Sequence, residues 1–222
     1  MPVDKEKTLE RLILAGERLI AQRGIEGLSL RQVNLEAGQK NTSAALYHFG
    51  TKEGLMMAVF DYRMAHVDQR RHDLLDQDES SIRALMKAWI VPDIEEIAET
   101  EGGSYHARFL AVVCNHPEFR VQDLWHRPHA SSYLRLSDGL KRLLPNLSPQ
   151  LFSMRFGMAM LQSIYAIADQ ERLVAADKAT AISAPLFVSH LIDVMEAILT
   201  APVSADTERE LELTANLTRR AS

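Results

Sequence analysis

The chain has 222 residues, 46% of them hydrophobic and 25% charged, a composition typical of globular proteins that excludes an intrinsically disordered chain. Its one cysteine, Cys114, excludes an intramolecular disulfide and fits a reducing cytoplasm. The net charge of −5 does not favour nucleic-acid binding, but charge near a site matters more than the total.

An amphipathic helix is predicted from Lys5 to Arg23, because apolar residues recur at every third or fourth position and polar residues fill the opposite side. The apolar positions are Leu9, Leu12, Ile13, Gly16, Leu19 and Ile20, and the polar positions are Glu10, Arg11, Glu17 and Arg18. This helix would cover the core of the short helices that follow, since two short helices alone bury too little surface to fold.

Three short helical signals lie between Leu28 and Leu55. Ser29 can cap the first helix, and Gln32 stands three residues later to complete a capping box. Gly38 is placed where helices commonly end in a left-handed residue.

A second short helix is predicted through residues 44–47. Its candidate caps are Asn41, Thr42 and Ser43. Gly50 closes it, and Thr51 can cap the next helix. Two short helices joined by a Gly-containing turn indicate a helix-turn-helix.

The second helix suits a DNA groove, because it begins with short polar side chains and one lysine, which let its backbone approach base edges and phosphates. Residues 1–75 hold 11 Lys and Arg against 10 Asp and Glu, whereas residues 76–222 hold 14 against 20. The charge distribution permits DNA binding without establishing it.

The sequence YHF at residues 47–49, followed by TKEGL at 51–55, resembles the DNA-binding signature of the TetR/AcrR family of one-component regulators. The resemblance covers about residues 5–65, and the rest of the chain is similar to the family in length and helical pattern. The interval between residues 37–38 and 48–49 is one residue longer than in the commonest members. Which of residues 40–45 face the bases therefore stays open.

The resemblance implies a set of DNA-contacting residues. Base or near-base contacts are expected from Lys40, Asn41, Thr42, Ser43 and Ala44. Phosphate contacts are expected from Arg31, Tyr47, His48 and Lys52. Lys52 stands at a helix start, where free N–H groups and its own charge favour a phosphate; the alternative is a solvated surface lysine.

Further helices are predicted at residues 51–75, 81–99, 105–115, 130–144, 148–169 and 183–199, with a possible short helix at 119–125. Pro92 is expected to kink or break its helix. Strand signals are absent, so the chain is predicted to be all-α. The expected domains are a three-helix helix-turn-helix DNA-binding domain at 5–65, a helical ligand-binding and dimerisation domain at 76–200, and a polar, loose tail at 201–222.

The helices at 148–169 and 183–199 are strongly apolar, which suits a homodimer interface; the alternative is that they complete a monomeric core. By resemblance to the family, they would pair with their symmetry mates in a four-helix bundle. A two-fold dimer presents two recognition helices to successive major grooves of a palindromic operator.

The middle helices carry large, adaptable side chains that would line an apolar pocket with a few polar anchors, although plain core packing is the better explanation for any one of them taken alone. The candidate lining is Met64, Met86, Trp89, Tyr105, His106, Phe109, Trp125, Met158, Gln162 and Tyr165. In the family this domain binds a small molecule, which implies an effector here, of apolar character.

Other chemistry finds little support. His116, His126 and His129 are close in sequence, but Pro128 separates the last two, so no metal site and no cofactor are predicted. Cys114 is interpreted as a core residue, with a thiol sensor as the alternative. No catalytic motif is found, so the chain is not predicted to be an enzyme. Neither a signal peptide nor a membrane span is indicated.

The sequence therefore predicts a cytoplasmic, ligand-responsive transcriptional regulator, most simply a repressor, that binds double-stranded operator DNA as a homodimer. The alternative is a helical small-molecule binding or interaction protein whose helix-turn-helix does not touch DNA.

Overall fold

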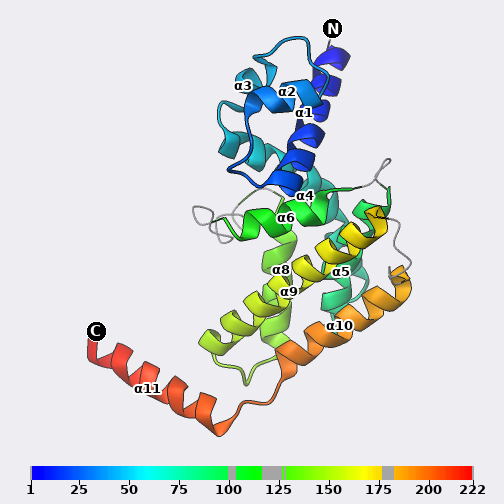
Figure 1. Cartoon of the computed structure of the whole chain (residues 1–222). Helices are drawn as coiled ribbons and strands as arrows, with labels where there is room; N and C mark the ends of the chain where they lie inside the picture. The colour runs from blue at the N-terminus through cyan, green and yellow to red at the C-terminus, as the bar shows by residue number, and fades with distance from the viewer. Residues whose placement is uncertain (1, 100–103, 117–126, 128, 177–182, 222) are drawn as a thin grey trace.

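The computed structural model describes residues 2–99, 104–116, 127, 129–176 and 183–221, and every regular element in these ranges is a helix, as the sequence predicts. In chain order the helices are α1 (Pro2–Arg23), α2 (Leu30–Glu36), α3 (Ala44–Phe49), α4 (Lys52–Gln77), α5 (Ile82–Glu99), α6 (His106–Cys114), α8 (Ser131–Leu143), α9 (Pro149–Ala175), α10 (Ala184–Thr200) and α11 (Ala205–Ala221). Figure 1 shows α1–α3 as a small head above a larger body formed by α5, α6, α8, α9 and α10, with α4 joining the two. The short helix predicted at 119–125 lies outside the described residues.

The head is built around a hydrophobic core shared by α1, α2, α3 and the first half of α4. Core residues that are at most 3% exposed include Leu12, Leu19, Ile20, Leu28, Val33, Ala45, Leu55 and Val59. Helices α1 and α4 cross closely at Gly16, where a Cβ atom would lie 2.8 Å from Leu55 Cδ1. The apolar face predicted for α1 is therefore the face that covers the helix-turn-helix.

Local sequence signals set the ends of the head helices. Ser29 and Gln32 form the predicted capping box of α2, and Gly38 follows that helix with a φ of 64°. Gly50, with a φ of 70°, closes α3, and the Thr51 side chain caps α4. Both glycines adopt the left-handed region, which other residues enter only with strain.

Helix α4 belongs to both parts of the molecule. Leu55 and Val67 lie in the hydrophobic cluster of the head, whereas Leu75, two turns further on, lies in the cluster of the body. Phe109 and Val113 of α6 also pack into the head cluster. A displacement of the C-terminal half of α4 therefore reaches the head directly.

Helix α5 spans almost the whole predicted range 81–99 and continues through the buried Pro92 without a break, because packing of α5 against α4 and α10 outweighs the lost backbone hydrogen bond. Helix α9 extends to Ala175 instead of ending near Asp169, because its last turns pack against α6. By length and a mean hydropathy of 1.2, α9 could span a membrane, but half of that apolar segment is buried inside the fold.

The C-terminal tail also differs from prediction. Residues 201–222 are predicted to be loose, but the structure forms α11, which begins after an extended connection at 201–204. In Figure 1, α11 points away from the body, and Leu213 is 51% exposed. Its sequence is rich in residues that favour helix, such as Glu, Leu and Arg.

Two short body helices are capped by acidic side chains from other helices. Asp68 of α4 accepts from the Ser132 N–H and the Ser131 hydroxyl of α8, both at 2.9 Å. Glu171 of α9 accepts from the Arg108 N–H of α6 at 3.1 Å. Burial opposes charge on Asp68, but the hydrogen bonds from α8 hold the pKa of its carboxyl below the usual range. These caps fasten α8 and α6 to the long helices.

Candidate nucleic-acid interface and ligand cavity

The surface around the start of α3 is polar and open. Four consecutive predicted base-contacting residues are exposed, namely Lys40, Asn41, Thr42 and Ser43. Tyr47 projects from α3 with 83% of its surface exposed, and its ring meets the exposed His48 edge-on at a centroid distance of 5.3 Å. Helix α3 therefore presents short polar groups at one end and a projecting aromatic hydroxyl further along.

The remaining predicted DNA-contacting residues include both exposed and buried side chains. Arg31 is exposed on α2, and Lys52 is partly exposed, with its Nζ 3.4 Å from the Glu26 carbonyl oxygen. Ala44, in contrast, is only 8% exposed and packs in the head core, so its methyl group does not face outward to meet a base. Leu46, which the sequence analysis passed over, is 57% exposed on α3.

Asn34 of α2 fixes the geometry of the turn. Its side chain is 1% exposed, and its Nδ2 donates to the carbonyl oxygens of Leu30 at 3.0 Å and Thr42 at 2.7 Å. Its Oδ1 accepts from the Ala45 N–H at 2.9 Å. Helix α3 is thus capped from α2, while the Ser43 side chain makes no capping hydrogen bond. The clue in the sequence was an asparagine in the middle of a short amphipathic helix.

Replacing Asn34 with alanine is expected to lower the free energy of unfolding by about 2 kcal/mol, because the buried Ala45 N–H would lose its acceptor. Denaturant unfolding measures this loss. The matched control is Asn41→Ala in the same turn, which removes an exposed hydrogen bond to the Ser43 N–H and should cost less than about 1 kcal/mol. Equal losses in the two variants would contradict the role assigned to Asn34.

Arg63 of α4 joins the head to the body through buried ion pairs. Its Nε and Nη2 donate to the Glu17 carboxylate of α1 at 2.8 and 2.7 Å, and its Nη1 donates to Glu96 of α5 at 2.6 Å. Arg63 is 5% exposed and Glu17 only 2%. The prediction that Glu17 lies on the solvent side of α1 is therefore wrong, because α4 and α5 cover that side and supply its counter-ion.

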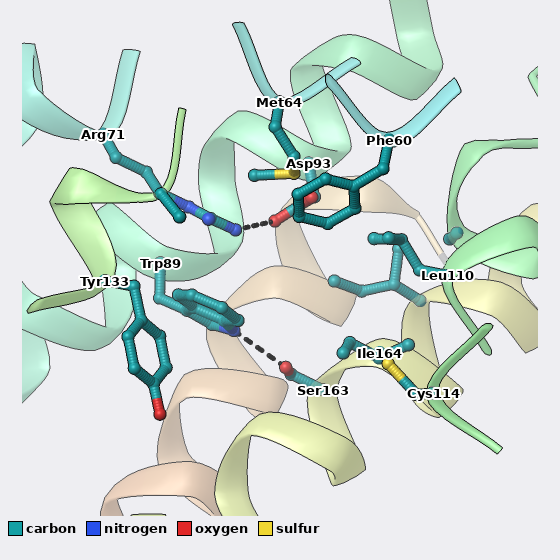
Figure 2. A pocket seen from close by; sticks show the side chains of 13 residues that line it. Phe60, Met64, Arg71, Trp89, Asp93, Leu110, Cys114, Tyr133, Ser163 and Ile164 are labelled. Carbon is teal, nitrogen blue, oxygen red and sulfur yellow. Dashed lines mark hydrogen bonds and ion pairs between the residues drawn. The ribbon is translucent and has the colours of Figure 1, made fainter. Parts of the chain in front are cut away.

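A cavity of about 40 Å³ lies between α4, α5, α6, α8 and α9 (Figure 2), and its lining residues Phe60 and Met64 also belong to the head cluster. Its wall is mostly apolar and aromatic, with a few polar side chains. The lining residues are Phe60, Met64, Arg71, Trp89, Asp93, Ala107, Leu110, Cys114, Ala130, Tyr133, Ser163, Ile164 and Ile167. The space is enough for a few water molecules but much smaller than a typical ligand pocket of several hundred Å³.

The structure places some of the predicted pocket residues at this cavity and others elsewhere. Met64 and Trp89 line it. Met86 and Phe109 are fully buried in the surrounding core, and His106 stands behind Asp93. Tyr105 packs beside Arg108, and Trp125 lies outside the described residues.

Three predicted pocket residues are on the surface instead. Met158, Gln162 and Tyr165 are exposed on α9, since apolar residues occur almost all round this helix and size alone does not indicate which side is buried. Arg71, Asp93 and Ser163 lie in the cavity wall and were not predicted from the sequence.

A buried charged group stands at one side of the cavity. Arg71 Nη2 donates to Asp93 Oδ2 at 2.7 Å, and the guanidinium lies over Trp89, with Cζ 3.8 Å from the ring centroid. His106 Nε2 is 3.0 Å from the other Asp93 oxygen. Burial opposes charge on Asp93, but Arg71 and His106 hold the pKa of its carboxyl below the usual range. Burial raises the pKa of the Cys114 thiol to about 11, which keeps it protonated and disfavours a thiol sensor.

Helix α9 leaves an apolar stripe uncovered. Met154, Met158, Leu161 and Tyr165 follow one another at helical spacing and are between 38% and 56% exposed. Leu186 near the start of the neighbouring α10 is 62% exposed. Contiguous exposed apolar side chains of this kind are typical of protein interfaces.

Comparison with known proteins agrees with these features. Residues 12–59 match the model described as "Bacterial regulatory proteins, tetR family", and residues 87–197 match "Tetracyclin repressor-like, C-terminal domain". A 110-residue segment is 26% identical to the HTH-type transcriptional repressor NemR of Escherichia coli strain K12 and covers 49% of this chain and 55% of that protein. The chain thus spans about half the length of the curated relatives it matches.

The chain also resembles solved structures, and one of them shares the fold with a TM-score above 0.5. A tetR-family transcription regulator from Shewanella sp. PV-4 superposes with a TM-score of 0.59 at 13% identity, covering 85% of this chain and 95% of that one. A TetR-family transcriptional regulator from Rhodococcus sp. covers 88% of this chain and 100% of its own, with a TM-score of 0.47 at 16% identity. The matched families are regulators of transcription and not enzymes. The two family models together account for the head and most of the body, and the chain belongs to the TetR family of transcriptional regulators.

Proposed function

We propose that this regulator binds a two-fold symmetric operator as a homodimer, acts as a repressor in the cytoplasm, and releases DNA when an apolar small molecule enters the body. The observation that carries the proposal is the double role of α4. The same helix supplies Leu55 and Val59 to the head core and Phe60, Met64 and Arg71 to the cavity wall.

DNA recognition follows from the surface of α3. Short polar side chains at the start of the helix allow close approach to base edges, which suits Thr42 and Ser43. Exposed donors around them, including Arg31, Tyr47 and Lys52, are suited to phosphate oxygens, which position the helix without reading sequence.

Dimerisation is proposed through α9 and α10. The stripe from Met154 to Tyr165 runs along the side of α9 that the described body leaves exposed. A second copy related by a two-fold axis would cover it with the same stripe, since a two-fold interface is self-complementary. Two heads would then face DNA together.

Effector response follows from the small size of the cavity. A molecule of more than a few heavy atoms does not fit into about 40 Å³ unless the walls move apart. Because α4 forms one wall, ligand entry favours a different position of α4, and with it a different spacing of the heads. A ligand shifts this equilibrium only through its difference in affinity for the two arrangements.

The proposal predicts distinct effects for two kinds of substitution on α3. Tyr47→Ala is expected to weaken binding to all DNA sequences by roughly tenfold, because it removes a phosphate contact. Thr42→Ala or Ser43→Ala is expected to change which sequences are preferred. Gel shifts at a stated salt concentration, using duplexes from the DNA upstream of the chain's own coding sequence, measure both effects.

Leu213→Ala on α11, far from the head in Figure 1, is the control and should leave both affinity and preference unchanged. If the wild-type protein binds none of the duplexes, the result would support the alternative hypothesis of a helical ligand-binding protein that does not contact DNA. Equal behaviour of the Tyr47 and Thr42 variants would contradict the division into phosphate and base contacts.

A further inference from the structure

We propose that Arg71 anchors an uncharged, hydrogen-bond-accepting oxygen, such as a ketone or ester carbonyl, on an otherwise apolar effector. The inference rests on the proposed function, in which the cavity receives the effector, and adds the chemical class of that molecule. It refines the sequence-based expectation of an apolar effector to an apolar compound with one polar end group.

The Arg71 guanidinium is held in place but not fully satisfied. The residue is 3% exposed, its Nη2 donates to Asp93, and its plane lies against Trp89. Its Nε is buried and has no hydrogen-bond partner among the described residues. Arginine has donors only, and a buried donor left without an acceptor is costly. An oxygen brought by a ligand would satisfy this donor.

Ser163, another polar side chain of the wall that Figure 2 shows beside Trp89, is already engaged. Ser163 Oγ accepts from Trp89 Nε1 at 2.9 Å and donates to the Met160 carbonyl oxygen at 2.7 Å. Of these two side chains of the wall, Arg71 is the one whose buried donor, Nε, is left without an acceptor in the part of the chain that the structure describes. The surrounding Phe60, Met64 and Trp89 side chains suit an apolar or aromatic body.

Charge balance at Arg71 favours a ligand with an uncharged end group over a ligand with an anionic end group. Asp93 already neutralises Arg71 and also faces His106 Nε2 at 3.0 Å. A ligand carboxylate at Arg71 would stand near the Asp93 carboxylate in a water-poor site, where like charges repel strongly. A carbonyl oxygen accepts the same hydrogen bond without that repulsion.

The test compares three molecules that share a similar phenyl-alkyl skeleton and differ in the end group. They are butylbenzene, benzylacetone and phenylbutyrate. Isothermal titration calorimetry on the full chain gives their affinities, and Trp89 fluorescence in a Trp125→Phe background reports occupation of the cavity. Benzylacetone, the ketone, is expected to bind most tightly. Tightest binding of butylbenzene or of the anion phenylbutyrate would overturn the proposal.

Arg71→Lys tests the residue directly, because lysine keeps a positive charge for Asp93 but has no Nε donor. The preference for benzylacetone over butylbenzene is expected to fall by about tenfold in this variant, the size of one hydrogen bond to a charged group. The matched control is Arg70→Lys on the same helix, whose Glu95 partner lies outside the cavity and whose preference should not change. An unchanged preference in Arg71→Lys would overturn the proposal.

Two further measurements keep the result decisive. If Arg71→Lys does not fold, the double variant Arg71→Met and Asp93→Leu removes both buried charges together and should show the same loss of preference. DNA binding of the wild type is measured on the same samples. Failure to bind DNA would overturn the proposed function, whereas normal DNA binding with no preference for the ketone would overturn only the assignment of Arg71.

Discussion

Replacing Arg63 with methionine is expected to lower the free energy of unfolding by about 3–5 kcal/mol, the cost of removing one partner from a buried ion pair. Glu17 is 2% exposed and would keep its charge without the Arg63 counter-ion, and Glu96 would lose its hydrogen bond to Arg63. Denaturant unfolding at neutral pH, followed by circular dichroism, measures the loss. Arg63 holds α1, α4 and α5 together. In the variant, the amide hydrogen-exchange rates of the head and of the body should therefore differ, because the two parts open separately.

A triple variant separates the charge effect from simple loss of packing. Changing Glu17 and Glu96 to leucine in the Arg63→Met background is expected to recover most of the lost stability, since apolar residues of similar volume often replace a buried ion network without penalty. The control is Arg83→Ala at an exposed ion pair with Asp193, which should cost less than about 1 kcal/mol. A triple variant as unstable as the single one would contradict this explanation.

Introducing a charge into the exposed stripe of α9 is expected to separate the subunits. Met158→Glu would place a carboxylate in the proposed dimer interface opposite its own symmetry mate. Operator affinity should then fall by about 100-fold, because the two heads no longer bind as one molecule. Light scattering after size-exclusion chromatography reports the mass, and fluorescence anisotropy reports DNA affinity.

Val174→Glu provides the matched control on the same helix. Val174 is 57% exposed, but it lies sixteen residues beyond Met158, which places it on nearly the opposite side of α9. This variant should remain dimeric and bind DNA normally. A Met158→Glu protein that stays dimeric would rule out α9 as the interface.

Much of the head was predictable because its signals are local. The Ser29–Gln32 capping box, Gly38 after α2 and Thr51 before α4 each act within a few residues of chain, where spacing alone determines geometry. The cap of α3 was not predictable in this way. Asn34 reaches it from eleven residues away, and the acceptors at α6 and α8 come from Glu171 and Asp68 at still greater separation.

The residues that line the cavity were only partly predictable, because they too are brought together from distant parts of the sequence. Large apolar residues were predicted to line it, and Met64 and Trp89 do, but Met158 has the same character and is exposed. Periodicity does not show which side of an all-round apolar helix faces inward. Arg71 was also missed, because a buried arginine is recognised only when its partner, Asp93 on another helix, is known.

Hydroxyl-radical footprinting of an upstream duplex that the protein binds in the gel shifts, with and without an effector, tests the central claim most directly. Two symmetric protected segments on one face of the duplex are expected, with centres separated by one helical turn, about 34–36 Å, or a multiple of it. Both should vanish together when the effector is added, because α4 moves both heads. A single protected segment, or two that an effector bound in the cavity leaves unchanged, would contradict the account.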